Sequence, residues 1–187
     1  MRKNFGAKAI CYPMPVFIIG TYNEDGTPNA MNAAWGGTAN SNKIAICVDR
    51  NHKTTENFLN RKAFTVAIAD ETNVIPSDYV GIVSCFDVPD KISRAGLTPV
   101  KSEFVDAPVF EEYRMTLECQ MVSYDHDSEL LIGEIVNVSA DECVLGEDGL
   151  IDIMKLKPIS YDPVHHGYHI MGDKVGTAFS DGKKLDL

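Results

Sequence analysis

The chain has 187 residues, of which 44% are hydrophobic and 24% charged, as in ordinary globular proteins, and its net charge is −10. This acidic balance argues against a nucleic-acid binder, which needs a basic surface to displace counterions, and against docking on anionic membranes. No apolar run reaches the roughly 18 residues of a membrane span, and the N-terminus lacks the apolar core of a secretion signal.

The first elements form a predicted hairpin. Residues 16–22 (VFIIGTY) are rich in β-branched and aromatic side chains, the NEDG sequence that follows is typical of a turn, and a second extended run begins near Pro28. Next come two apolar strands, over residues 43–48 and 63–69. A short helix over residues 54–62 separates them, and we expect Thr54 or Thr55 to cap it.

The secondary structure in the middle of the chain is harder to predict. Residues 78–84 (DYVGIVS) fit either a helical turn or a strand, because a short apolar run does not distinguish the two. The segment DVPDKISRAGL predicts a helix with Asp87 as its cap, Pro89 in its first turn and Gly96 as its stop.

The second half predicts a long strand pair. Residues 111–123 alternate, with Met115, Leu117, Cys119 and Met121 on one face, as in a half-buried antiparallel strand. Residues 130–139 are the expected partner across the DHDS turn, and residues 173–179 (DKVGTAF) the expected last short strand. Six or seven strands with two or three short helices and short connections favour a mainly β fold, an antiparallel barrel. We expect residues 1–187 to form a single domain.

The five cysteines are scattered, without a CxxC pair, which fits neither a disulfide framework nor a zinc site. We therefore expect reduced thiols and a cytoplasmic protein. Cys47 and Cys119 lie in apolar strands and are expected to be small core residues.

The stretch from Pro28 to Thr55 carries the predicted chemistry. Trp35, the only tryptophan, stands between Ala34 and a glycine pair, where small residues allow backbone to approach a flat ligand. The loop DRNHKTT then leads into a helix N-terminus, which offers N–H groups and cations to an anion, most simply a phosphate. A planar group plus a phosphate describes a nucleotide or a flavin. The alternatives are solvated loop charges and a tryptophan of the core.

Several segments, in their order along the chain, carry a resemblance to a known family: PMPVFIIGT, NAMNAAWGG, DRNHKTTENF, DYVGIVS, RAGL and SYDPVHHGYHIMGDKVGTAF. Together they resemble the flavin reductase-like, FMN-binding split-barrel family, and its flavoredoxin-like members most of all. The resemblance covers nearly the whole chain. It implies a split barrel of antiparallel Greek-key type that forms a homodimer, with FMN held non-covalently near the subunit interface.

The resemblance also implies which residues contact FMN. Those along the ring are Asn29, Ala30, Met31, Ala33, Ala34 and Trp35, with Cys47 and Val48 at the adjacent strand end. Those around the phosphate are Arg50, His52, Lys53, Thr54 and, one helical turn on, Asn57. Further implied contacts are Ser84, Cys85 and His169. Cys85 stands where relatives often have glycine, and its side chain restricts close backbone approach to the flavin there.

Other site chemistries find little support in the sequence. Adjacent His165 and His166, with His169 nearby, point to opposite sides of an extended chain and lack a partner ligand, so we expect no metal. Cys85 has no resolving cysteine nearby, which disfavours a redox thiol. No GxSxG, P-loop or GxGxxG motif is present. We also expect no catalytic side chain, because hydride moves directly to a flavin.

The sequence therefore leaves two main functions open. The first is an FMN-dependent oxidoreductase that takes electrons from NADH or NADPH and passes them to free flavin or a redox partner protein. The alternative is a flavoredoxin-type carrier without NAD(P)H activity, whose acidic surface suits docking on basic patches. A third hypothesis is a nonenzymatic FMN- or haem-binding sensor, because a fold does not fix a function. The preferred donor and the acceptor stay open.

Overall fold

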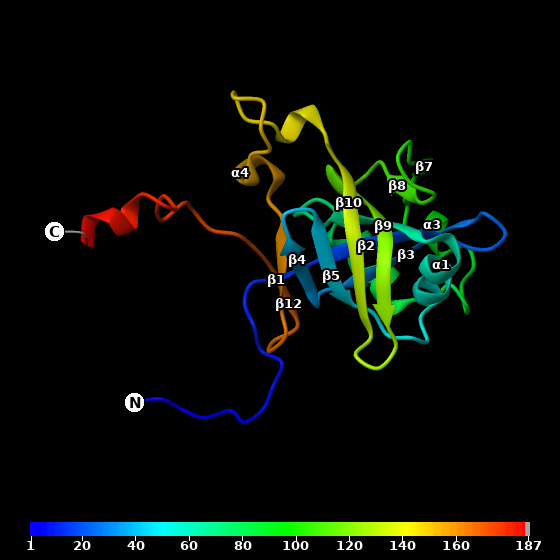
Figure 1. The fold of residues 1–187 in the computed structure, drawn as a ribbon, viewed down its shortest axis with the longest axis horizontal. Coiled ribbons are helices and arrows are strands. Elements are labelled where there is room, and N and C mark those ends of the chain that lie inside the picture. Colours follow the sequence, from blue (N-terminus) through cyan, green and yellow to red (C-terminus); the bar gives the residue numbers. More distant parts are fainter. Residues whose placement is uncertain (186–187) are drawn as a thin grey trace.

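A curled, antiparallel seven-stranded sheet dominates the computed structural model, which describes residues 1–185 (Figure 1). Its strand order is β3-β2-β6-β9-β10-β5-β4. The strands are β2 (Phe17–Tyr22), β3 (Pro28–Ala33), β4 (Gly36–Asn40), β5 (Lys43–Cys47), β6 (Ala63–Ile68), β9 (Met115–Asp125) and β10 (Leu130–Ala140). The mainly β, antiparallel fold predicted from the sequence is confirmed.

Two smaller sheets and a few short helices surround this sheet. One small sheet has the order β1-β11-β12, and the other pairs β7 with β8. Their strands are β1 (Met14–Pro15), β7 (Pro99–Lys101), β8 (Pro108–Phe110), β11 (Ile159–Asp162) and β12 (Gly167–Ile170). The helices are α1 (Lys53–Arg61), α2 (Val74–Ile82), α3 (Lys91–Arg94) and α4 (Ile153–Leu156), with 3₁₀ turns η1 (Glu142–Val144) and η2 (Asp181–Leu185).

The long strand β9 has the predicted inward face, but its first half is not half-buried as expected, because Thr116 and Glu118 of the other face are buried as well. Leu117 and Cys119 are buried in a core cluster, and the other two predicted inward residues, Met115 and Met121, pack against it. Gly133 of β10 makes room for this core, because a Cβ there would lie 2.3 Å from the ring of Phe64. Helix α1 closes the same core through Phe58.

A second core lies on the opposite face of β2, β3 and β6. Here Ile18 and Ala30 of the sheet pack with Val80 of α2 and Ile92 of α3. Helices α1 and α2 therefore cover opposite faces of the sheet beside its edge strand β3. This layering brings segments that are far apart in sequence to a common place next to β3.

The helix boundaries correct two predicted N-caps and settle one alternative that the sequence left open. Helix α1 begins at Lys53 with His52 as its N-cap, and neither Thr54 nor Thr55 caps it; the hydroxyl of Thr55 donates to the carbonyl of Asp49 (2.7 Å). The undecided segment 78–84 is mostly the end of α2. Helix α3 is one turn long with Asp90 as its N-cap, not Asp87. Its predicted stop is correct, because Gly96 has φ +70°.

The C-terminal region and one cysteine also differ from expectation. Residues 173–179 form no strand; the last strands are β11 and β12, whose pairing was not predicted. Cys47 is exposed rather than in the core, because Ile44 and Ile46 occupy the inward positions of β5. Among residues 1–185, no helix combines the length and apolar character needed to cross a bilayer.

Candidate functional site

A cavity of about 190 Å³ lies where β3 meets the start of α1 and the segment from α2 to α3. Four separate parts of the chain supply its walls. The lining residues are Asn29, Met31, Asn32, His52, Lys53, Thr54, Val80, Gly81, Ile82, Val83, Ser84, Cys85 and Lys91.

The first wall is the N-terminus of α1. The N–H groups of Thr55 and Glu56 donate to the carbonyl of His52, at 3.0 and 3.3 Å. The N–H groups of Lys53 and Thr54 have no acceptor within the helix, since they lie in its first turn. With the positive end of the helix dipole, they favour an anion in front of them.

The Lys53 side chain adds a positive charge to this wall. Its Nζ lies 2.6 Å from the carboxylate of Glu56 and 5.5 Å from the centre of the Phe86 ring. Its ion pair with Glu56 is partly exposed and therefore weak. An incoming anion can therefore replace Glu56 as the partner of Lys53 at a small cost in free energy.

Asn29 of β3 carries a buried hydrogen-bonding atom without a partner. Its side-chain nitrogen donates to the hydroxyl of Thr54 (2.9 Å), which ties β3 to α1. Its Oδ1 has no hydrogen-bond partner among the described residues, although the residue is 1% exposed. Leaving a buried acceptor unsatisfied costs about 1–3 kcal/mol, and the residue that carries this atom lines the cavity.

Lys91 of α3 is a buried cation in the same cavity. The residue is 3% exposed, and its Nζ donates to the carbonyl of Val83 at 3.1 Å. Burial lowers the pKa of Lys91 to about 8, and the neighbouring Cys85 opposes the shift. No ion pair links Lys91 to a carboxylate in the described part of the chain. An ammonium has three donors, so Lys91 can offer two to an anion.

Close approach of α2 to β3 completes the cavity. A Cβ on Gly81 would lie 2.9 Å from the Cβ of Asn32, so glycine allows this contact. The Asn32 side chain donates to the carbonyl of Ser77 (3.0 Å), which fixes α2 against β3. Tyr168 of β12 donates to Asp78 of α2 at 2.8 Å, and burial, followed by Asp78, raises the pKa of Tyr168 to about 12.

The structure brings seven of the sixteen predicted site residues into this cavity. They are Asn29, Met31, His52, Lys53, Thr54, Ser84 and Cys85. Ala34 and Trp35 instead line a separate hollow of about 230 Å³ against residues of the N-terminal segment. The planar part and the anionic part of the predicted site therefore do not share one pocket within a single chain.

The other predicted residues lie in the core or at the surface. Ala30, Ala33, Val48 and Asn57 are buried, and Asn57 bonds to Thr21 and Asn23 at 3.0 and 2.8 Å. Cys47, Arg50 and His169 are exposed, and Arg50 pairs with Glu129 at 3.0 Å. Their contacts with FMN stay predictions.

The histidines of the tail make separate local contacts. Nδ1 of His165 lies 2.8 Å from Asp162, whereas Nδ1 of His166 lies 2.7 Å from the hydroxyl of Tyr161. Among residues 1–185, no three His, Cys, Asp or Glu side chains gather as metal ligands would.

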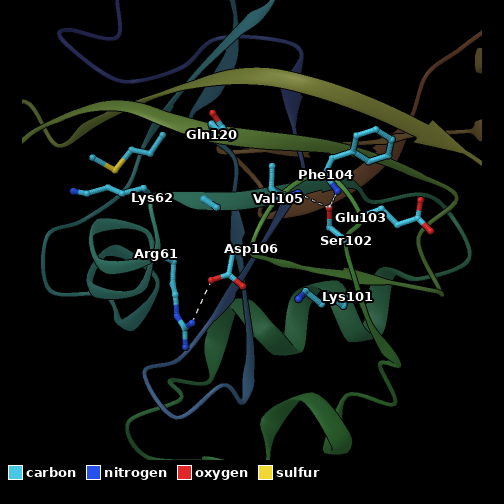
Figure 2. Close-up of a pocket in the computed structure, with 11 residues that line it drawn as sticks. Arg61, Lys62, Lys101, Ser102, Glu103, Phe104, Val105, Asp106 and Gln120 are labelled. Carbon is cyan, nitrogen blue, oxygen red and sulfur yellow. Dashed lines mark hydrogen bonds and ion pairs between the residues drawn. The ribbon is translucent and has the colours of Figure 1, made fainter.

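A larger hollow of about 590 Å³ lies beside the loop between β7 and β8 (Figure 2). Arg61 pairs there with Asp106 at 3.2 Å and also donates to the carbonyls of Asn23 and Glu24. None of the lining residues has a buried polar atom without a partner in the described structure. This hollow is larger than the cavity beside β3, but the buried polar groups described in it already have partners within the protein.

Lys91 and Asn32 were missed by the sequence analysis. Lys91 follows Asp90 in a polar segment typical of a solvated helix, and no local pattern marks its burial. Asn32 lies three residues from Asn29 in a strand, so its side chain faces the other side of the sheet from that of Asn29. A usable signal was Gly81 within an apolar run, since an isolated glycine often marks a close backbone approach.

The profile of the Flavin reductase like domain family matches residues 9–162. Flavoredoxin of Desulfovibrio vulgaris (Miyazaki F) is 39% identical with a TM-score of 0.93, covering 98% of this chain and 100% of its own. A flavoredoxin from Methanosarcina acetivorans is 27% identical (TM-score 0.88; coverage 99% and 100%). Nitrilotriacetate monooxygenase component B from Bacillus cereus is 26% identical (TM-score 0.76; coverage 88% of each chain). The predicted split-barrel fold is confirmed.

Proposed function

The chain belongs to the flavin reductase-like domain family, and from this membership we propose that it binds FMN non-covalently and transfers electrons as a flavoredoxin-type carrier. The similarity to two flavoredoxins over almost the whole chain supports a carrier more than an NAD(P)H-dependent reductase. FMN, when bound, supplies the electron-transfer chemistry. The residues of this chain bind it, orient it and control its surroundings.

One observation carries the proposal. A single cavity is lined by buried Lys91, by Asn29 with its unpartnered Oδ1, and by the N-terminus of α1. Two of these features offer donors or positive charge, and the third offers an acceptor. A phosphate with neighbouring hydroxyl groups matches that set, because it presents anionic oxygens together with donors.

The size of the cavity suits one end of the cofactor. Its volume of about 190 Å³ is below the roughly 300–1,000 Å³ of pockets that enclose whole ligands. We therefore assign the cavity to the phosphate end, held by Lys91, Lys53, His52 and Thr54. We assign the ring of FMN to residues 33–35, where small side chains allow the backbone to approach a flat group.

A homodimer with FMN near the subunit interface is part of the proposal. Trp35 is 58% exposed beside an N-terminal segment whose residues 1–13 are all exposed. Large apolar surface of this kind is typical of an interface between subunits. A redox partner protein is the proposed acceptor, and the net charge of −10 favours a partner with a basic docking patch.

An FMN-dependent NAD(P)H:flavin reductase is the second candidate. The similarity to a monooxygenase component, together with the family membership, favours it over other enzymes. This reaction needs no acidic or basic side chain from the protein, since hydride passes directly between nicotinamide and flavin.

Two measurements on the purified protein test the proposal. An absorption spectrum and a fluorescence titration with FMN should show stoichiometric flavin binding. NADH and NADPH should then leave the bound flavin oxidised, or reduce it much more slowly than a reduced redox protein does. Rapid steady-state oxidation of either nucleotide would favour the reductase. Absence of FMN binding would overturn both candidates.

A further inference from the structure

The N-terminal arm, residues 1–13, is basic, partly apolar and largely unpacked. It contains Arg2, Lys3 and Lys8, and the first acidic residue of the chain is Glu24. Phe5 is 62% exposed, and the arm leaves the body beyond β1 (Figure 1). Ordering such a segment costs about 1–2 kcal/mol per residue, which exposed apolar side chains do not offset within one chain.

A second exposed surface has the opposite charge. The acidic segment, residues 141–154, carries five carboxylates, and Lys155, which follows it in α4, places a cation on it by donating to the carbonyl of Leu145 (2.5 Å). Four of its apolar side chains are at least 40% exposed: Leu150, Ile151, Ile153 and Met154. The segment is nevertheless well ordered, because Gly146 donates to the carbonyl of Leu150 (2.7 Å) and Asp152 to that of Val144 (2.8 Å).

The small sheet places these two surfaces at opposite ends. Strand β11 begins just after the acidic segment and α4, and it ends at the 163–166 turn. Strand β1 runs antiparallel to β11 with Met14 opposite Tyr161, so the arm lies beyond the turn. A hollow between the arm and Pro163 and Val164 agrees with this position. In Figure 1 the N-terminus and α4 lie on opposite sides of the small sheet.

We propose that the N-terminal arm of one copy docks on the acidic segment of a second copy. The inference rests on the homodimer of the proposed function and names the surfaces that form it. A two-fold axis that sets the two small sheets antiparallel brings each arm to the partner's acidic segment. The contact occurs twice and is self-complementary, as a two-fold interface requires. Lysines and arginine meet carboxylates, and Phe5 and Ile10 meet the exposed apolar side chains.

The test reverses charge on each side in the FMN-loaded full chain. The dimer dissociation constant is measured by sedimentation at two salt concentrations. Lys3→Glu with Lys8→Glu should raise it by at least about tenfold, and so should Glu147→Lys with Asp148→Lys. Combining all four substitutions should restore most of the affinity. The matched control is Lys62→Glu with Lys101→Glu, a change of equal charge on surface remote from the arm, which should leave the constant unchanged.

A photo-crosslinker placed at Phe5 gives a second readout. Crosslinks should join two chains and map to residues 141–154 of the other copy. Crosslinks within one chain, or a dimer unaffected by the arm substitutions, would overturn the arm contact while leaving the homodimer intact. A protein that binds FMN yet sediments as a monomer would contradict the homodimer itself.

Discussion

The hollow beside the β7–β8 loop and the cavity beside β3 both contain cations, and they differ in what those cations already contact. In the larger one Arg61 is paired with Asp106 and bonded to two carbonyls. In the smaller one Lys91 is buried with a single carbonyl partner, and Asn29 keeps an unpartnered oxygen. The smaller cavity therefore has hydrogen-bonding and charge capacity that the protein does not use.

The comparison shows that volume is a poor guide to a binding site. A paired, partly exposed arginine gains little from an additional anion, because its charge is already compensated. A buried ammonium without a carboxylate raises the energy of the free protein, and an anionic ligand removes that cost. This difference predicts how substitutions in the two hollows separate binding from stability.

The largest effect is expected for Lys91→Met. FMN affinity should fall by about ten- to a hundredfold, because a charged hydrogen bond contributes about 1.5–3 kcal/mol. The free protein should become more stable by about 1–3 kcal/mol, since methionine fills a similar volume without a buried charge. Fluorescence titration and urea unfolding measure the two changes. A variant that loses stability and keeps its affinity would mean that Lys91 has only a structural role.

The stability and the FMN affinity of the wild-type protein should both depend on pH through the titration of Lys91. The pKa of Lys91 is about 8, below its usual 10.5, so the unfolded chain binds more protons between these values and stability of the free protein should rise with pH there. FMN affinity should change in the opposite direction. It should fall by up to about tenfold per pH unit above pH 8, because the phosphate favours the charged amine.

Lys91→Arg is the control for this profile. Arginine keeps its charge to high pH, so FMN affinity should no longer decline between pH 8 and 10. A decline that persists in this variant would assign the titration to another group.

A smaller effect is expected at the rim of the cavity. Lys53→Ala should weaken FMN binding by about three- to tenfold, because Lys53 lines the cavity but is already paired with Glu56. Arg50→Ala should change it by less than about twofold, because Arg50 lies outside the lining and pairs with Glu129. Equilibrium titration ranks the two. A larger loss of FMN affinity in Arg50→Ala than in Lys53→Ala would support the contact between Arg50 and the phosphate that was predicted from the sequence.

The smallest effect on binding is expected in the larger hollow. Arg61→Ala should leave FMN affinity unchanged and lower the free energy of unfolding by about 1 kcal/mol, through the lost bonds to the carbonyls of Asn23 and Glu24. Titration with FMN measures the affinity, and urea unfolding measures the free energy of unfolding. Weaker FMN binding would show that the two hollows are coupled.

Much of the fold was predictable because its signals are local. The hairpin of β2 and β3 follows from β-branched residues around a turn. Strand β9 follows from alternation, and β10 from its position across the DHDS turn. The small sheet was missed, since β11 (ISYD) and β12 (GYHI) are short and show neither pattern. The caps of α1 and α3 were misplaced, because several polar residues near each helix start were equally suitable.

The sequence by itself determined the β-rich class, the main strand pairs and the position of a basic loop before α1, since periodicity and turn chemistry act over a few residues. The tertiary structure alone decided which cation is buried and which residues surround it. Asn29, Lys53, Cys85 and Lys91 meet only because α1 and α2 pack on opposite faces beside β3. Burial depends on such distant contacts, and burial is what separates the charge of Lys91 from that of an ordinary surface lysine.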